Sequence, residues 1–372
     1  MVQKHRCISL FSGAGGMDVG FKSAGVDVIW ANEMDKDACA TFRENHKETL
    51  LREGDILQYM DELTSLKDID IIFGGPPCQG FSVAGKMDPT DERSKLIWTF
   101  MDAVRIVRPK AFILENVKAL AALEKWRPVR EKIISYASDL GYVCYPVLLN
   151  ASHYGVPQKR ERVFFIGFLN NEPGLENLIS RIITHQKKPK SIRETLISLG
   201  PAGSETNPLT CTAKITLATK PIMRKSPYAG MIFNGMGRPL DIDNFANTLP
   251  ASMGGNKTPI IDEVLLHNSR DNNWIEDYHK SLINNQVAPQ FEEAPSRLRR
   301  ITINEAALIQ TFPKDYIFRG SKTSIYKQIG NAVPCLLAEA VARAVVEELN
   351  SRQTVSSNDE PRQLCLEEYI NV

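Results

Sequence analysis

The stretch Gly74-Gly75-Pro76-Pro77-Cys78-Gln79-Gly80-Phe81-Ser82 directly follows an apolar run, Ile69-Asp70-Ile71-Ile72-Phe73. The run predicts a buried strand, so Cys78 would lie just past a strand's carboxyl end, where open α/β sheets build their active sites. Two prolines fix the backbone before the sulfur, and the flanking glycines let a substrate approach closely. Cys78 is therefore either a nucleophile or a small buried apolar residue, and the loop alone leaves both readings open.

Short apolar runs alternate with helical patterns through the first 168 residues. This alternation predicts an α/β fold, a doubly wound and mostly parallel sheet covered by helices on both faces. No helical pattern separates the last two strands, so we expect one of them to be antiparallel. The expected strands are 7–11, 26–33, 69–75, 110–116, 142–149 and 162–168, and the expected helices are 16–24, 35–45, 94–107 and 127–140.

The character of the sequence changes near residue 170. Residues 170–295 are rich in Pro, Gly, Asn and Thr and show few clear periods, which predicts a smaller, loop-rich domain. Helical periodicity returns at 304–312 and 334–349, and the tail after Asn350 is polar. We therefore expect a sheet domain at 1–170, a loop-rich domain at 171–298, a return segment at 299–350 whose last helix packs on the sheet domain, and a tail at 351–372.

Charge is nearly balanced over the 372 residues, with a formal net charge of +1. The field of the whole molecule would not gather polyanions, so nucleic-acid binding would require a local patch. Residues 181–225 hold nine Lys or Arg against two Glu, and Arg297, Arg299 and Arg300 form a second basic cluster. One such run is commonly a solvated face, whereas two in one chain favour a surface that contacts phosphates.

Seven cysteines occur without a CxxC pair. This spacing argues against a disulfide framework and against a zinc cage, so we expect no metal. The start of the chain has no long apolar segment, and no run approaches the ~18–20 apolar residues that span a bilayer. We expect a cytoplasmic protein with no membrane association.

A glycine-rich turn, Phe11-Ser12-Gly13-Ala14-Gly15-Gly16-Met17-Asp18, follows the first expected strand and opens the first helix. Free N–H groups at a helix start suit an anionic ligand group. A dinucleotide fingerprint would have a third glycine where Asp18 stands, and a carboxylate facing a pyrophosphate would be repelled. The turn therefore favours a ligand with an amino-acid moiety over a diphosphate.

Two acidic residues follow at the ends of the next expected strands. Glu33 comes twenty residues after Gly13, the spacing at which an acid accepts the hydroxyls of a ribose. Asp55 is placed to accept from an adenine amino group, and Met34 and Ile56 would sandwich the ring. The combination favours an S-adenosyl ligand over NAD.

The ordered motifs resemble those of the cytosine-C5 DNA methyltransferases over nearly the whole chain. The resemblance implies an S-adenosylmethionine-dependent, Rossmann-like methyltransferase domain, with 171–295 as the variable target-recognition region. It rests on FSGAGGMDVGF at 11–21, GGPPCQGFS at 74–82, Glu115-Asn116-Val117, Gln158-Lys159-Arg160-Glu161-Arg162, RRITINEAALIQTFP at 299–313 and Gly330-Asn331-Ala332-Val333-Pro334.

The resemblance implies a role for each matched residue. Cys78 would be the nucleophile, Glu115 would contact N3 and the exocyclic amine of cytosine, Arg162 its O2 oxygen, and Arg160 would brace the site. Ser82, Arg238 and Asn256 are expected to contact DNA. The cofactor residues would be Phe11, Ser12, Gly13, Gly15, Gly16, Glu33, Met34, Asp55, Ile56, Pro76, Asn331 and Ala332.

The implied reaction is methyl transfer from S-adenosyl-L-methionine to C5 of a flipped cytosine in double-stranded DNA, with S-adenosyl-L-homocysteine as product. We expect a monomer in a bacterial restriction-modification system, with a cognate restriction endonuclease acting on the same site. Alternatives are a tRNA cytosine-5 methyltransferase, a catalytically silent DNA-binding relative and a nicotinamide oxidoreductase. The length of 171–295 favours DNA over tRNA, and intact Cys78, Glu115 and Arg162 disfavour a silent relative.

Overall fold

The chain divides into two compact units. The computed structural model describes residues 4–77, 95–170 and 173–352. The first unit comprises 1–154, 160–187 and 333–372, and the second comprises 155–159 and 188–332. The expected boundaries at 171 and 299 are thus displaced, because helix 175–184 packs in the first unit and 299–332 packs in the second.

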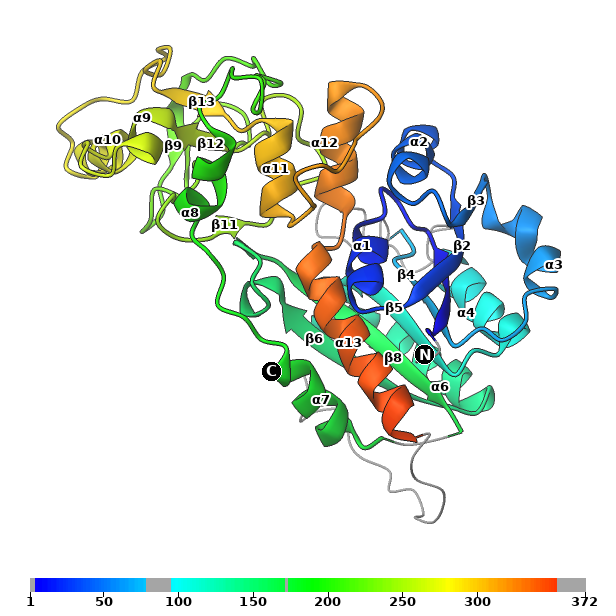
Figure 1. Ribbon diagram of the computed structural model, residues 1–372. Helices are drawn as coiled ribbons and strands as arrows, with labels where there is room; N and C mark the ends of the chain where they lie inside the picture. The colour runs from blue at the N-terminus through cyan, green and yellow to red at the C-terminus, as the bar shows by residue number, and fades with distance from the viewer. Residues whose placement is uncertain (1–3, 78–94, 171–172, 353–372) are drawn as a thin grey trace. The chain divides into compact units, whose positions relative to one another are not determined.

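A seven-stranded mixed sheet forms the centre of the first unit, in the order β3-β2-β1-β4-β5-β8-β6 (Figure 1). β1 to β5 run parallel to one another, and β8 runs antiparallel to both β5 and β6. The predicted antiparallel strand is therefore confirmed as β8. The strands are β1 (Arg6–Leu10), β2 (Asp27–Glu33), β3 (Leu50–Glu53), β4 (Ile71–Gly74), β5 (Ala111–Val117), β6 (Tyr142–Asn150) and β8 (Glu161–Leu169).

Helices cover both faces of this sheet. Phe73 of β4 stacks on Phe21 of α1 with ring centroids 3.7 Å apart. Phe112 of β5 is level with Ile72, so it points to the opposite face, where it meets Phe100 of α4 edge-on. The helices are α1 (Gly16–Ser23), α2 (Lys36–Asn45), α3 (Met60–Leu63), α4 (Lys95–Val107), α5 (Lys118–Ala122), α6 (Arg127–Asp139), α7 (Leu175–Thr184) and α13 (Cys335–Arg352).

The last helix returns to the first unit and packs along α1 (Figure 1). α7 packs beside it, and Arg181 of α7 forms an ion pair of 2.9 Å with the buried Glu348 of α13. Leu175, Leu178 and Ile182 are buried along one face of α7, which explains why this amphipathic helix belongs to the sheet unit.

The second unit is built from short strands and helices around a small apolar core. Its cluster includes Leu217, Phe233, Ile260, Ile275 and Leu298. The elements are β7 (Gln158–Lys159), α8 (Ile192–Leu196), β9 (Leu217–Ile222), β10 (Met231–Phe233), β11 (Ala246–Asn247), β12 (Ile260–Asp262), α9 (Glu263–His267), α10 (Trp274–Ile283), β13 (Leu298–Arg300), α11 (Ile303–Ile309) and α12 (Lys322–Asn331).

The helical stretch 322–351 is long and apolar enough to meet the length and composition test for a membrane span. In the fold, 67% of its apolar window is buried, as in a core helix. The sequence prediction considered only unbroken apolar runs. It did not identify this stretch, because polar and apolar residues alternate within it at helical spacing.

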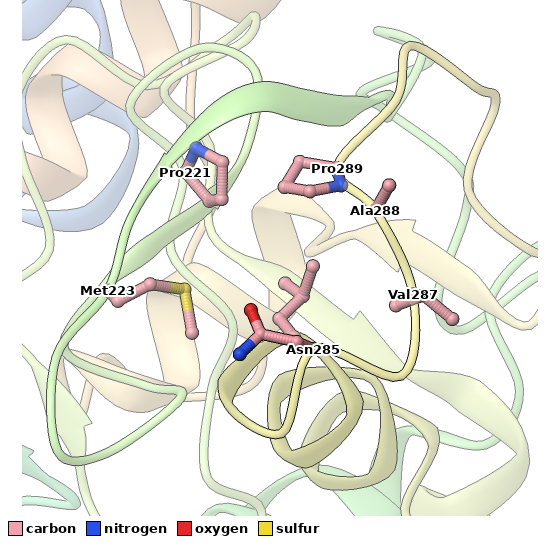
Figure 2. Close-up of a pocket in the computed structure, with 7 residues that line it drawn as sticks. Pro221, Met223, Asn285, Val287, Ala288 and Pro289 are labelled. Carbon is pink, nitrogen blue, oxygen red and sulfur yellow. The ribbon is translucent and has the colours of Figure 1, made fainter.

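A cavity of about 310 Å³ lies in the second unit (Figure 2). Its lining side chains carry no ionisable group, so it offers no acid, base or nucleophile. They are Pro221, Met223, Leu282, Asn285, Val287, Ala288 and Pro289.

Candidate functional site

The turn after β1 has an unusual backbone. Phe11, Gly13 and Gly15 all have positive φ, at 54°, 56° and 81°. Glycine adopts this region freely, whereas it is uncommon and strained for phenylalanine. The turn closes with Gly15 N donating to Ser12 O at 2.9 Å, and α1 then begins at Gly16.

Glu33, at the end of β2, holds this turn through its carboxylate. Its Oε2 accepts from Gly13 N at 2.8 Å, and its Oε1 accepts from the backbone N–H groups of Met34 and Asp35, each at 2.8 Å. A carboxylate has about four acceptor sites, so lone pairs remain for the hydroxyls of a ligand. Glu33 therefore orients the turn and can still receive a sugar.

Asn32 joins the three adjacent strand ends and was not singled out from the sequence. Its Nδ2 donates to Arg52 O and Gly54 O at 3.0 Å, and its backbone O accepts from Ser12 N at 3.1 Å. Its side chain is 2% exposed, so these bonds satisfy a buried amide. A polar residue inside the apolar strand VDVIWANE was the signal that could have identified it.

The two apolar residues predicted to sandwich a ring differ in exposure. Met34 is 65% exposed, whereas Ile56 is 2% exposed and belongs to the apolar core of the first unit. The structure thus gives the Ile56 side chain a packing role and leaves Met34 available to a ligand. The exposed Asp55 accepts from Leu57 N at 3.0 Å through Oδ1, which orients its carboxylate.

Asp18 does not face a ligand, so the repulsion predicted from its position in the sequence is wrong. Its side chain has no exposed surface, because the first turn of α1 directs it into the fold. Burial raises the pKa of Asp18 to about 7, and the Ser9 hydroxyl acts in the opposite sense. The residue is a buried acid beneath the turn.

The start of the Cys78 loop is held between two strand ends. A Cβ on Gly74 would lie 2.1 Å from Leu10 O, so only glycine allows β1 and β4 to approach so closely there. A Cβ on Gly75 would lie 2.8 Å from Glu115 Oε2, and Pro76 O accepts from Asn116 Nδ2 at 3.3 Å. This tether brings the loop's first residues against the end of β5.

Glu115 and Arg162 meet at that point. β5 and β8 pair antiparallel with Val117 level with Arg162, and Arg162 Nε lies 2.9 Å from Glu115 Oε1. The two side chains are only 11% and 13% exposed. Burial raises the pKa of Glu115, while the nearby charges of Arg162 and Arg160 oppose that rise. A carboxyl with a raised pKa holds its proton more readily and, when protonated, can donate to a ring nitrogen.

Arg160 is 1% exposed and acts on Glu115 through its charge. Its backbone O accepts from Ala151 N at 2.9 Å, which fixes the start of β8. The structure thus brings Glu115, Arg160, Arg162 and the Gly75–Pro76 turn together. Cys78 and Ser82 lie outside the described residues.

The remaining predicted site residues belong to the second unit. Asn331 and Ala332 end α12, with Ala332 N donating to Gln328 O at 3.1 Å. Arg238 and Asn256 are exposed on neighbouring loops, because Gly237 N donates to Asn256 O at 2.9 Å and Ile260 N donates to Arg238 O at 2.9 Å. These bonds bring the two predicted DNA contacts onto one surface.

The second basic cluster does not form a phosphate-contacting surface, and that reading is wrong. Arg297 pairs with Asp262 at 2.9 Å, and Arg299 pairs with Glu263 and with Glu305, the latter at 2.7 Å. The pairing of β12 with β13 places Arg297 and Arg299 beside Asp262 and Glu263, which are distant in the sequence, whereas Glu305 lies six residues after Arg299.

Arg300 completes the cluster and is also inward-facing. It is 2% exposed and donates to Thr258 O at 2.7 Å. Of the first cluster, Lys187, Lys188 and Lys190 are exposed, whereas Arg193 pairs with Asp243 at 2.6 Å. The basic residues available to a partner are therefore fewer than the sequence suggested.

The model of the family described as C-5 cytosine-specific DNA methylase matches residues 5–347. The chain is 32% identical to the type II methyltransferase M.FnuDI of Fusobacterium nucleatum, over 94% of this chain and 96% of that protein. It is also 32% identical to the type II methyltransferase M.Eco47II of Escherichia coli, over 92% of this chain and 79% of that protein.

Solved structures share the fold at lower identity. The S. pombe Dnmt2 methyltransferase has a TM-score of 0.64 at 17% identity, covering 94% of this chain and 99% of its own. The Entamoeba histolytica methyltransferase EhMeth has a TM-score of 0.64 at 18% identity, covering 93% and 99%. Together with the family match, these findings mean that the chain belongs to the C-5 cytosine-specific DNA methylase family and is a DNA cytosine-5-methyltransferase.

Proposed function

We propose that this enzyme methylates C5 of a flipped cytosine within a specific double-stranded DNA sequence, using Cys78 as nucleophile and S-adenosyl-L-methionine as donor. The observation that carries the proposal is the Glu115–Arg162 pair, held against the Gly75–Pro76 turn that leads directly into Cys78. One acid and one cation of this kind suit the Watson–Crick edge of a cytosine.

The chemistry requires a thiolate and an acid, because carbon 5 of cytosine is a poor nucleophile. A bond from the Cys78 thiolate to C6 makes the C5–C6 edge an enamine, and C5 can then take a methyl group. Negative charge that develops toward N3 is relieved by the proton of Glu115, whose pKa burial raises. A base, for which a water molecule suffices, then takes the C5 proton, the S–C6 bond breaks to release the Cys78 thiolate, and the N3 proton returns to Glu115.

The turns after β1, β2 and β3 fit an S-adenosyl ligand. Gly13 has no atom within 4 Å of an added Cβ, Met34 is exposed, and the Glu33 carboxylate retains lone pairs. When bound, S-adenosyl-L-methionine supplies an electrophilic methyl group. Phe11, Ser12, Gly15, Gly16 and Pro76 would border the ligand, Glu33 would receive its ribose, Asp55 would accept from its adenine amino group, and Met34 would lie against the adenine ring. Asn331 and Ala332 complete the proposed set.

DNA recognition is proposed for the region 171–298. The exposed Arg238 and Asn256 carry donors suited to base edges and phosphates, and Ser82 would contact the DNA near the nucleophile. A flipped base costs a few kcal/mol of lost stacking and pairing, which these contacts would offset. We further propose that the enzyme acts as a cytoplasmic monomer that protects host DNA from a cognate restriction endonuclease.

A covalent trap tests the nucleophile. Duplex DNA carrying 5-fluorocytosine at the methylated position should form a stable adduct at Cys78 in the presence of the donor, because fluorine cannot leave as a proton does. The adduct would be identified by peptide mass, after sequencing of methylated host DNA has established the recognition sequence.

Cys78→Ser should abolish methyl transfer and the adduct while cofactor affinity stays close to that of the wild type. A matched control is Cys144→Ser, which alters a buried strand cysteine of the same unit. Full activity in Cys78→Ser, or methyl incorporation into tRNA and not into duplex DNA, would contradict the proposal.

A further inference from the structure

Two buried glutamines form a bonded pair in the second unit. Gln158 of β7 and Gln310, at the end of α11, are both 0% exposed. Gln158 Nε2 donates to Gln310 Oε1 at 2.9 Å, although 152 residues separate them in the sequence. Buried amides of this kind must be bonded, so the pair constrains the segments that carry them.

Both ends of the pair are bonded to backbone groups, which fixes the direction of the chain of hydrogen bonds. Leu249 N donates to Gln158 Oε1 at 2.9 Å. Gln310 Nε2 donates to Ile329 O at 2.6 Å and to Ala332 O at 3.2 Å. A flip of either amide would oppose two donors or two acceptors, so one arrangement alone satisfies all of these groups.

The bonded groups belong to segments that also touch one another. β7 pairs parallel with β11, and Thr248 Oγ1 donates to Lys159 O at 2.9 Å. A Cβ on Gly330 would lie 2.6 Å from Pro250 O, so the end of α12 lies directly against the segment that follows β11. The glutamine pair is the buried centre of this junction.

Two of the joined segments, β7 and the end of α12, lie next in the sequence to residues of the proposed site. Arg160 follows Gln158 by two residues, and Asn331 lies between the two carbonyls that Gln310 holds. The third segment, β11 with Thr248 and Leu249, lies inside the region proposed to recognise DNA. We propose that the Gln158–Gln310 pair is a positioning device, which fixes β7, from which the chain runs on to Arg160 and Arg162, and the end of α12 against the recognition segment.

This inference rests on the proposed function, because it assigns the pair an effect on methyl transfer. A change at Gln158 should shift the backbone that leads into Arg160. Arg162, which forms the ion pair with Glu115, follows Arg160 by two residues. Small misplacements of reacting groups cost large factors in rate, of about tenfold to a hundredfold. The expected defect is therefore in kcat rather than in the affinity for DNA.

The main experiment compares Gln158→Leu with Gln328→Leu in the full chain. Gln328 is a matched control, since it is 6% exposed in the same unit but donates locally, to Arg319 O and Ser324 Oγ. The two variants should lose a similar amount of thermal stability, measured as the fall in Tm. Gln158→Leu should nevertheless lower kcat by about tenfold or more, with KM for DNA changed less than about threefold. Gln328→Leu should keep kcat within about twofold of the wild type.

A second variant, Gln158→Glu, tests the direction of the bonds. Its ionised carboxylate would oppose Gln310 Oε1, whereas its protonated carboxyl would donate to that atom and still accept from Leu249 N. Burial raises the pKa of such a carboxyl, so kcat relative to the wild type should recover as pH is lowered from about 8 to about 6. Gln158→Leu should show no recovery.

The outcomes separate this inference from the proposed function. If the wild type does not methylate duplex DNA, the proposed function fails. If the wild type is active but Gln158→Leu and Gln328→Leu lose kcat equally, the pair is only structural and the inference is overturned. Should Gln158→Leu not fold, a flat pH profile for Gln158→Glu overturns the inference in the same way.

Discussion

The two units handle charged side chains in opposite ways. In the first unit, Glu115 and Arg162 are nearly buried at two strand ends, in a setting that raises the pKa of Glu115. In the second unit, Arg297 and Arg299 are bound by acidic residues as supports, while the exposed Arg238 lies on a loop. The comparison teaches that a buried carboxyl whose desolvation outweighs its cationic neighbours suits chemistry, whereas ion pairs that fix an arginine in place suit architecture.

Of the substitutions that test this comparison, Glu115→Gln should have the largest effect, a loss of kcat. The amide keeps the shape of the carboxyl but cannot supply its proton, so kcat should fall by about 10²- to 10⁴-fold. In the wild type, activity that depends on protonated Glu115 should decline as pH rises through its raised pKa. Single-turnover rates measured across pH would give both the loss of rate in the variant and the fall of the wild-type rate at high pH. If the rate of Glu115→Gln fell at high pH as the wild-type rate does, another group would be responsible for the titration.

Arg299→Ala should reduce stability rather than DNA binding. Removing this arginine takes the cationic partner from the buried Glu305, which keeps neutral donors from Asn207 and Thr302, at a cost of about 3–5 kcal/mol. Denaturant unfolding would measure the loss. A variant that kept its stability but bound DNA more weakly would restore the phosphate-contacting role for this cluster.

Asp18→Asn tests whether burial without a compensating charge is costly in the first unit. The pKa of Asp18 is about 7 in the fold against 3.8 as the ordinary value, which corresponds to about 4 kcal/mol. This stability is present below pH 3.8 and is lost as pH rises toward 7, because the folded state disfavours the ionised form. The amide of the variant does not ionise, so the variant should be the more stable protein at about pH 8 and should lose the advantage near pH 4. Denaturant unfolding at the two pH values would measure the difference.

Arg238→Ala should have the smallest effect and leave stability unchanged within about 0.5 kcal/mol. An exposed arginine that contacts DNA should contribute about 1–3 kcal/mol to the free energy of DNA binding. If it contacts a phosphate, its loss should reduce the slope of log binding constant against log salt concentration by about 1. DNA binding at several salt concentrations would measure this. Lys257→Ala, on the loop next to Asn256, is a matched control for a general loss of charge.

Parts of the fold were predictable because their signals are local. The strands and helices of the sheet unit show in apolar periodicity, and the strand without a preceding helix is indeed the antiparallel β8. β3 was missed because it is a short edge strand whose residues remain partly exposed. α7 was missed although Leu175, Leu178 and Ile182 recur at helical spacing, because the surrounding region is dominated by loop-forming residues. α12 was missed because its apolar pattern is weak, with Tyr326 and Ile329 as its buried large side chains.

The sequence by itself determined the α/β class, the family resemblance and the residue types of the chemistry, because motifs and periodicity depend on neighbours along the chain. Only the tertiary structure decided that Glu115 meets Arg162, that Asp18 and Ile56 face inward, and that Arg297, Arg299 and Arg300 are internal supports. The physical reason is that burial and ion pairing depend on strand register and on partners far away in the sequence, and local composition carries no record of either.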